Sequence, residues 1–398
     1  MSRSSGRKGS LAYPSRPLSR PQLAARLRQA RKEDWDYRRG TIFGSMCTQP
    51  MEEAVRAARP FVTANLGNPG LCPGTARLEE ELVRWLLELF HGPRFGAGGS
   101  IVTGGTEANL TALWVARNVS GGTEVVLPRS AHFSFVKALD LLSLKPRWIP
   151  VDSKGRSIPH KAARAITRKT AAVIAVAGST ELGAVDPVEE LSELALEAGV
   201  HLHVDAAFGG FVLPFLKEAG REYLPFDFSL EGVSSLAVDP HKLGGAPVPS
   251  GALLFREVKE AGSISVDSPY LSSPAVTALL GTRPSANVAA TFAALARMGR
   301  SGHIRTLRQV LALTQRIADE GQRMGLELVT DPMINIVAFR HRNPAGVQAE
   351  MLRKGWDVSA IREPGSLRFV VMPHVTEESV ARMLRDLRTV LRGSPPNG

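Results

Sequence analysis

Cysteine is scarce in this sequence, and long hydrophobic runs are missing. Only two cysteines occur, Cys47 and Cys72, and they are too far apart for a C-x-x-C motif. Two isolated thiols indicate a reducing compartment, which we take to be the cytoplasm, and no disulfide framework. No run of about 18 apolar residues occurs, so we expect no membrane-spanning helix. The basic N-terminus lacks an apolar segment, so we expect no secretory signal.

The chain has a net charge of +11, and most of that charge lies at its N-terminus. Residues 1–40 hold eleven Lys or Arg and three Asp or Glu, a net charge of +8, which leaves +3 for the other 358 residues. A solvated, partly disordered arm explains this asymmetry. Attraction to RNA or an anionic surface is the alternative, and it would make the protein a binding module rather than an enzyme.

The length and composition suit a globular protein with one large domain and one smaller domain. The chain has 398 residues, of which 43% are hydrophobic. We expect a basic arm over 1–40, a large domain over 41–285 and a small α+β domain over 286–398.

Short apolar strands alternate with helical patterns between about residues 100 and 256. This alternation predicts an α/β fold with a mainly parallel sheet. The predicted strands are Glu124–Leu127, Arg147–Val151, Ala171–Ala177, His201–Val204, Ser235–Val238 and Ala252–Phe255, with Ile334–Phe339 and Leu367–Met372 in the small domain. The predicted helices are Gln22–Tyr37, Glu79–Phe90, Glu107–Arg117, Phe133–Leu142, Pro187–Glu197, Asn287–Arg297, Ile304–Met324 and Glu377–Leu391.

A His-Lys pair directly follows one of the apolar strands, in the run Asp239-Pro-His241-Lys242. Ligands of open α/β sheets bind at the carboxyl ends of the strands. A lysine near the sheet core is partly desolvated, and desolvation favours the neutral amine that can attack an aldehyde. On this stretch alone, an ordinary surface lysine is an equally good interpretation.

A second apolar strand ends in a carboxylate, Asp205, and is followed by Ala206 and Ala207. A buried Asp needs a cationic partner, and a pyridinium nitrogen could be that partner. The two alanines would leave room for a flat ring beside the strand. His201 and His203 lie two residues apart, but no further ligand cluster accompanies them, so we predict no metal site.

A Gly-rich turn, Thr103-Gly-Gly105-Thr106, opens a predicted helix. The free N–H groups of a helix N-terminus bind phosphate, and glycine lets the phosphate approach the backbone closely. Such turns are common, so this signal is weak by itself. His132 follows another strand and could stack on an aromatic cofactor, although a lone histidine is more often structural.

Taken together, these runs resemble the fold-type I pyridoxal-phosphate enzymes, and among them the group II decarboxylases, in particular the archaeal L-tyrosine/L-aspartate decarboxylase family. The resemblance extends from about Thr41 to Arg388. The runs that carry it are Ile42-Phe-Gly-Ser-Met-Cys47, Ser179-Thr-Glu-Leu-Gly183, Asp239-Pro-His-Lys242, Gly281-Thr-Arg283 and Leu367-Arg-Phe-Val-Val-Met-Pro-His374.

The resemblance implies pyridoxal 5'-phosphate as the cofactor and assigns roles around it. Lys242 forms the Schiff base with the cofactor, and Asp205 pairs with the pyridine nitrogen. His132 stacks on one face of the ring and Ala207 packs on the other. The remaining contacts are the phosphate-binding residues Gly105, Thr106 and His241, the strand-end residue Thr180 near the phenolic oxygen or substrate, and Arg368 at the substrate carboxylate.

Three more assignments concern loops and the oligomer. The resemblance implies a homodimer with a shared active site, in which Thr282 reaches the cofactor phosphate of the neighbouring subunit. Tyr270, one of only four tyrosines, is our candidate for the group that protonates Cα from a mobile loop, and a buried structural tyrosine is the alternative. Asn68 stands where the family often has Asp, and this change could alter the preferred substrate side chain.

The resemblance leaves the substrate open among tyrosine, aspartate and glutamate. Decarboxylation of tyrosine would supply tyramine for methanofuran biosynthesis, and decarboxylation of aspartate would supply β-alanine for coenzyme A biosynthesis. Sphingosine-phosphate lyases carry similar His-Lys and Asp-x-Ala patterns, so cleavage of a carbon–carbon bond in a phosphorylated amino alcohol is the alternative reaction.

Overall fold

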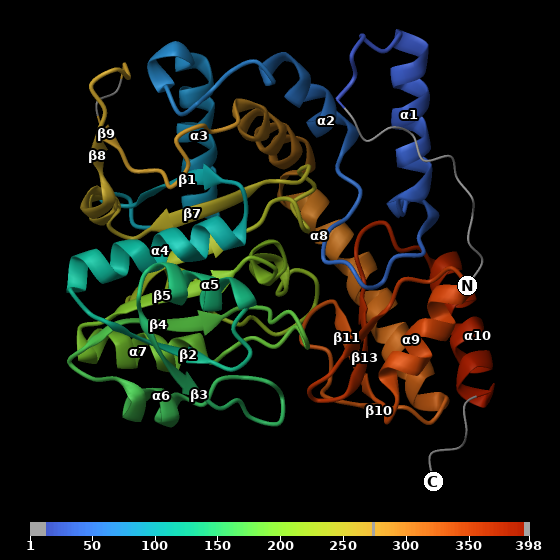
Figure 1. Cartoon of the computed structure of the whole chain (residues 1–398). Coiled ribbons are helices and arrows are strands. Elements are labelled where there is room, and N and C mark those ends of the chain that lie inside the picture. The colour runs from blue at the N-terminus through green and yellow to red at the C-terminus, as the bar shows by residue number, and fades with distance from the viewer. Residues whose placement is uncertain (1–12, 273–274, 394–398) are drawn as a thin grey trace.

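A seven-stranded sheet forms the centre of the chain, which a computed structural model describes over residues 13–272 and 275–393 (Figure 1). The strand order is β1-β7-β6-β5-β4-β2-β3, with β7 antiparallel to both of its neighbours and all other pairs parallel. The strands are β1 (Gly98–Val102), β2 (Glu124–Pro128), β3 (Lys145–Ile149), β4 (Thr170–Val176), β5 (His201–Ala206), β6 (Val233–Val238) and β7 (Gly251–Phe255).

Helices cover both faces of this sheet, as expected for a mainly parallel sheet. On one face α4 packs against β4 to β7 and against α5, whereas α7 packs against β4 and β5 on the other. The helices of this part of the chain are α2 (Glu52–Ala58), α3 (Pro73–Leu89), α4 (Gly105–Ser120), α5 (Phe133–Leu141), α6 (Pro159–Ala165) and α7 (Val188–Ala198).

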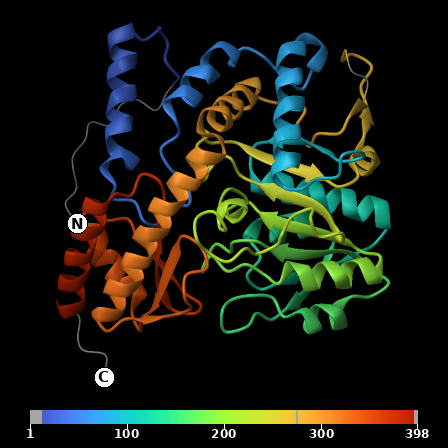
Figure 2. The same ribbon diagram turned by 180° about the vertical axis from the view of Figure 1, so that it is seen from behind.

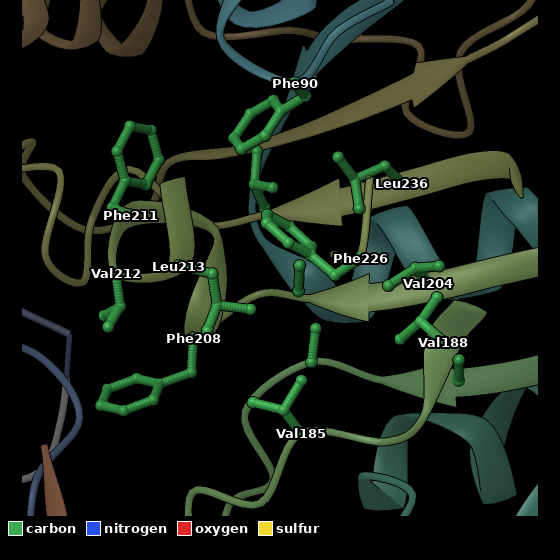
Figure 3. Close-up of a cluster of buried hydrophobic side chains, with 14 of the residues drawn as sticks. Phe90, Val185, Val188, Val204, Phe208, Phe211, Val212, Leu213, Phe226 and Leu236 are labelled. Atoms are coloured by element: carbon green, nitrogen blue, oxygen red, sulfur yellow. The ribbon is translucent and has the colours of Figure 1, made fainter. Parts of the chain in front are cut away.

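The two faces of β5 differ in character, because successive side chains of a strand point to opposite faces. Leu202 and Val204 belong to the largest hydrophobic core, on the side of α7. His203 and Asp205 lie on the opposite side and form hydrogen bonds with a residue of α4. Figure 3 shows the apolar side, where Val204 and Leu236 meet Phe226 and other buried side chains.

A smaller, four-stranded antiparallel sheet lies in the C-terminal part, in the order β10-β11-β13-β12. The long helix α8 (Ser285–Arg323) connects the two sheets, since it packs against α2 and α3 at one end and against β11 and α10 at the other (Figure 2). The remaining elements are β10 (Glu327–Leu328), β11 (Ile336–Arg340), α9 (Pro344–Arg353), β12 (Ser359–Ile361), β13 (Ser366–Val370), α10 (Glu377–Gly393) and the hairpin β8 (Val266–Asp267) and β9 (Ala275–Val276).

The fold class predicted from the sequence is confirmed, and several boundaries are corrected. The expected strand Arg147–Val151 begins two residues earlier, at Lys145, and β1 was not predicted at all. The two helices expected between Asn287 and Met324 are confirmed: α8 is interrupted at Gly299, where the backbone leaves the helical conformation with a φ of 55°.

The N-terminal arm contains a helix, α1 (Arg20–Glu33), which begins with a Ser19 capping box and buries none of its residues. It stands apart from the sheets (Figure 1). The helix expected over Gln22–Tyr37 therefore starts earlier and ends sooner. The disorder expected before it concerns mostly residues 1–12, which lie outside the described residues.

Across residues 13–272 and 275–393, no helix is long and apolar enough to cross a membrane. The same part of the chain has no group of three or more His, Cys, Asp or Glu residues placed to hold a metal ion.

Candidate active site

A cavity of about 330 Å³ opens at the carboxyl ends of the parallel strands. Five segments that are distant in the sequence meet there: the N-terminus of α4, the residues after β2, the end of β4, the end of β5 and the loop between β6 and β7. Eight of the residues predicted to bind or act on the cofactor line it: Gly105, Thr106, His132, Thr180, Asp205, Ala207, His241 and Lys242.

Lys242 lies in the cavity wall beside a carboxylate from its own turn. Its side chain is 16% exposed, and its Nζ lies 3.1 Å from Oδ2 of Asp239. The other oxygen of Asp239 is buried and has no hydrogen-bond partner among the described residues. Asp239 follows the last residue of β6, so the strand places the carboxylate where it can hold the lysine in position.

Asp205 is 6% exposed and lies near the end of β5. Its Oδ2 accepts a hydrogen bond of 2.8 Å from Nδ2 of Asn109, and its Oδ1 accepts one of 3.0 Å from the backbone N–H of Ala207. Two donated hydrogen bonds offset part of the cost of burying a carboxylate. The geometry leaves this carboxylate at the cavity wall, where a cationic ring nitrogen could meet it.

The N-terminus of α4 contributes backbone N–H groups that have no partner inside the helix. The preceding residue, Gly104, has a φ of 145°, a conformation that favours glycine. A Cβ atom on Gly104 would lie 3.3 Å from the ring of His241, and one on Gly105 would lie 3.0 Å from Cβ of Ala207. The two glycines therefore keep space free at a helix N-terminus, which is a suitable place for a phosphate group.

His132 caps α5 and lies at the cavity wall. Its Nδ1 is 2.9 Å from Oγ of Ser134. Burial lowers the pKa of His132, and the nearby Lys242 acts in the same direction, whereas the Asp205 carboxylate opposes them. A neutral imidazole at this position can lie flat against an aromatic ring without bringing a positive charge to it.

Residues 70–342 match the model of the pyridoxal-dependent decarboxylase conserved domain. This chain belongs to the pyridoxal-dependent decarboxylase family.

Relatives of this decarboxylase cover almost its whole length. A probable L-tyrosine/L-aspartate decarboxylase of Methanothermobacter thermautotrophicus is 45% identical over 89% of this chain and 98% of its own. An L-aspartate/L-glutamate decarboxylase of Pyrococcus horikoshii is 40% identical over 96% of this chain and 100% of its own.

Solved structures of other proteins have the same fold as this chain. A sphingosine-1-phosphate lyase of Burkholderia pseudomallei superposes with a TM-score of 0.89 at 26% identity, covering 97% of this chain and 94% of the lyase. A glutamate decarboxylase of Lactobacillus brevis gives 0.86 at 18% identity, covering 96% and 94%.

The residues of the cavity fit the cofactor of this family, pyridoxal 5'-phosphate. A lysine amine, a buried carboxylate and a Gly-lined helix N-terminus match the aldehyde, the ring nitrogen and the phosphate of that molecule in chemical character. The unpaired oxygen of Asp239 adds a polar group that is free to accept a hydrogen bond inside the cavity.

Arg368 of β13 lies next to the cavity of the decarboxylase rather than in its wall. Its Nη1 donates to the carbonyl of Thr180, and its Nη2 donates to the carbonyl of Gly44 at 2.7 Å and to Oγ of Ser359 at 3.0 Å. Its Nε is buried without a hydrogen-bond partner among the described residues. Burial lowers the pKa of Arg368, and Glu181 and Asp357 oppose this effect.

Three predicted site residues lie outside the cavity lining, in loops next to the hairpin β8–β9. Tyr270 is 83% exposed, and Thr282 is also exposed. Asn68 accepts hydrogen bonds through its Oδ1 from the backbone N–H of Ser272, at 3.3 Å, and from the Ser272 hydroxyl. The structure thus brings Asn68 and the Tyr270 loop together, and their roles stay predictions.

Two polar residues of the site were missed from the sequence. Asp239 is part of the Asp-Pro-His-Lys run, and its spacing of three residues from Lys242 was the available signal. Asn109 lies one helical turn beyond Gly105 in α4, on the side that faces β5. The sequence feature that could have indicated a polar partner such as Asn109 was the polar–apolar alternation of His201 to Asp205, which is unusual for the central strand of a parallel sheet.

Proposed function

We propose that this enzyme removes the α-carboxylate of L-tyrosine or L-aspartate as carbon dioxide, with Lys242, Asp205 and His132 at the cofactor and Arg368 at the substrate. The observation that carries the proposal is the single cavity in which a lysine, a buried carboxylate and a phosphate-binding helix N-terminus converge. The names of the relatives support the two substrates.

The protein residues would orient the substrate and keep charges in place. When bound, pyridoxal phosphate supplies an electron sink for the bond that breaks at Cα. Lys242 would hold the aldehyde carbon of the cofactor, and Asp239 would keep the lysine side chain in position. Asp205 would keep a proton on the ring nitrogen, and His132 would fix the plane of the ring.

Arg368 would hold the substrate carboxylate through the part of its guanidinium group that lacks a protein partner. Its two terminal nitrogens already donate to protein oxygens, which fixes the plane of the guanidinium group. The Nε–H is buried and has no hydrogen-bond partner among the described residues, so a substrate carboxylate would have to displace neighbouring atoms to reach it. One charge-assisted hydrogen bond from a rigid donor would orient the substrate without holding it in a bidentate fork.

Tyr270 would return a proton to Cα after the gas leaves, and it would do so in the active site of a second subunit. Its exposed hairpin and the adjoining loop also carry Leu71 and Val266, which are 77% and 62% exposed. Exposed apolar side chains on neighbouring loops favour burial against another protein surface. We therefore propose a homodimer in which this surface, together with Thr282, completes the partner's site.

A second cavity lies beside the cofactor cavity. It measures about 680 Å³ and shares Ser130 with the cofactor cavity. Its lining is mixed, since it contains charged residues such as Arg129 and Arg340 as well as apolar residues such as Leu182. Such a lining could accept a hydroxyphenyl or a carboxylate side chain, and the decarboxylase names of the relatives favour decarboxylation over the carbon–carbon lyase reaction.

The decisive experiment is carbon dioxide release from L-tyrosine, L-aspartate and L-glutamate by enzyme reconstituted with pyridoxal phosphate. Release from tyrosine or aspartate at the highest kcat/KM is the expected result. Turnover of a phosphorylated amino alcohol, without release from any of the amino acids, would contradict the proposal and favour the lyase.

The cellular setting follows from the proposed products. We propose a cytoplasmic enzyme that supplies tyramine for methanofuran or β-alanine for coenzyme A. The ratio of the two kcat/KM values decides between these pathways.

A further inference from the structure

A row of buried polar side chains extends away from the cavity behind Asp205. Asn109 comes from α4, His203 from β5 and Ser235 from β6, and all three are buried. His201 lies at the outer end of the row with 7% of its side chain exposed. Buried polar groups are costly unless every donor and acceptor is paired, so the way these residues are paired is informative.

The orientation of the Asn109 amide is fixed by its neighbour. An ionised carboxylate can only accept hydrogen bonds, so the group of Asn109 that faces Oδ2 of Asp205 at 2.8 Å must be the NH₂ group. The reversed amide would place two oxygens against each other. The carbonyl oxygen of Asn109 consequently faces His203, whose Nε2 lies 2.9 Å away.

His203 must then carry its proton on Nε2. Burial and, to a smaller extent, His201 together lower the pKa of His203 to about 3, so the ring is neutral and its Nδ1 is an acceptor. The Ser235 hydroxyl, 2.8 Å away, therefore donates to Nδ1. The Ser235 oxygen is left to accept from Nε2–H of His201 at 3.0 Å. Every hydrogen bond in this row points toward Asp205.

A branch connects the same amide to the other side of the cofactor cavity. The second N–H of Asn109 donates to Oγ of Ser134 at 3.1 Å. The Ser134 hydroxyl is then free to donate to Nδ1 of His132 at 2.9 Å, and the Ser134 backbone N–H points at the same nitrogen at 3.3 Å. His132 must therefore carry its proton on Nε2. One amide thus fixes both the Asp205 carboxylate and the His132 tautomer.

We propose that Asn109, His203 and Ser235 are positioning residues of the decarboxylase: they form a one-directional hydrogen-bond chain that holds Asp205 against the ring nitrogen and keeps His132 in one tautomer. The inference rests on the proposed pairing of Asp205 with the ring nitrogen. Outer partners of this kind fix the orientation and basicity of the inner group, as they do at metal sites. Their loss there costs about 10- to 100-fold.

The test uses holoenzyme reconstituted with pyridoxal phosphate that carries nitrogen-15 in the ring, because the resonance of that nitrogen reports whether it is protonated. His203→Leu removes the donor to Asn109, and His203→Gln keeps an amide N–H near the position of Nε2. Ser235→Ala removes a single oxygen from the chain. Ser234→Ala, at the neighbouring position of β6, is the matched control, since the Ser234 hydroxyl accepts from the Leu202 backbone N–H and does not belong to the hydrogen-bond chain. Cofactor dissociation and kcat are measured alongside.

We expect His203→Leu and Ser235→Ala to move the ring-nitrogen signal toward the unprotonated value and to speed cofactor loss. We expect kcat to fall about 10- to 100-fold in His203→Leu and about tenfold in Ser235→Ala. His203→Gln should recover most of these properties, and Ser234→Ala should match wild type. If His203→Leu does not fold, the comparison of Ser235→Ala with Ser234→Ala decides.

The inference is overturned if Asp205→Asn shifts the signal whereas the His203 and Ser235 variants keep the wild-type signal and cofactor retention. A wild-type signal in Asp205→Asn would instead contradict the pairing of Asp205 with the ring nitrogen. The role proposed for Asp205 would then be wrong, and the hydrogen-bond chain behind it would have no catalytic role.

Discussion

The cofactor cavity and the loops around Tyr270 are built in contrasting ways. In the cavity, buried polar side chains contact one another: Lys242 lies beside Asp239 of its own turn, and Asp205 of β5 accepts a hydrogen bond from Asn109 of α4. In the loops, Tyr270 is 83% exposed, and the Asn68 side-chain amide contacts the neighbouring loop through Ser272.

The difference shows which part of the site one chain can complete alone. Strand ends and a helix N-terminus hold the cofactor-binding groups rigidly, so these groups are in place before any ligand or partner arrives. Exposed loops obtain a fixed geometry only from an additional contact. A second subunit or the closing of the loop would supply that contact.

The strongest test of the cavity is Lys242→Ala. We expect the rate of carbon dioxide release to fall on the order of 10³-fold or more, because the covalent attachment point of the cofactor is lost. Lys259→Ala is the control, since Lys259 is exposed and pairs only with Glu257. Near-normal release of carbon dioxide by the Lys242 variant would show that the cavity is not the active site.

The strongest test of the loops is Tyr270→Phe. If the hydroxyl protonates Cα, kcat should fall by about 10²-fold, the lower part of the range for general acids, with little change in KM. Tyr223→Phe, the same substitution at a tyrosine outside the hairpin, is the control. Equal kcat values for the Tyr270 variant and wild type would show that the proton comes from elsewhere.

Lowering the pH should reduce the stability of the folded protein, because His201 and His203 are buried as neutral side chains behind Asp205. Burial lowers the pKa values of His201 and His203 to about 4 and about 3, below the ordinary 6.5. Between these values and pH 6.5 the unfolded chain binds more protons than the folded chain, so stability is full above 6.5 and falls as the pH decreases.

We expect each of these histidines to cost on the order of 1–2 kcal/mol of unfolding free energy between about pH 6.5 and about pH 5. Urea denaturation at both pH values measures the loss. His203→Gln should reduce it, and the exposed His160→Asn should leave it unchanged. A pH-independent stability would contradict the burial of neutral histidines.

Arg368→Lys tests whether Arg368, on strand β13 next to the cavity, contacts the substrate. Lysine keeps the charge but cannot contact Thr180, Gly44 and the substrate together. We expect kcat/KM to fall about tenfold, the value of one charge-assisted hydrogen bond, and KM to rise. Arg353→Lys, on the exposed side of helix α9, is the control. An unchanged KM would argue against contact with the substrate.

The smallest effect is expected for Asn68→Asp. An exposed charge changes an interaction by no more than about 1 kcal/mol, so the ratio of tyrosine to aspartate turnover should change by up to about fivefold. The added negative charge should disfavour aspartate. Asn118→Asp is the exposed control. A constant ratio would place Asn68 outside the substrate pocket.

Pattern and motif were enough to predict most of the sheet and eight residues that line the cavity. They failed at β1, which begins with Gly98 and Gly99, because glycine is uncommon in strands. A Cβ atom on Gly99 would lie 2.2 Å from the carbonyl oxygen of Leu253, so the close approach of β7 requires glycine there. A neighbour about 150 residues away in the chain imposes this requirement, and local periodicity cannot reveal it.

Arg368 shows the same limit at the site. Its residue type suggested a bidentate fork for a carboxylate, yet two of its nitrogens are engaged by protein oxygens. Asn109 was missed because its partners Asp205 and His203 come from another segment, and only folding brings α4 across β5.

Local sequence was enough to predict the α/β alternation, the lysine and the carboxylate at strand ends, and the Gly-rich helix N-terminus, because each depends on neighbours within a few residues. The donors that face Asp205 and His132, and the exposure of the loops around Tyr270, could be learned only from the three-dimensional arrangement. Those properties depend on the packing of separate elements, which fixes the direction of each hydrogen bond.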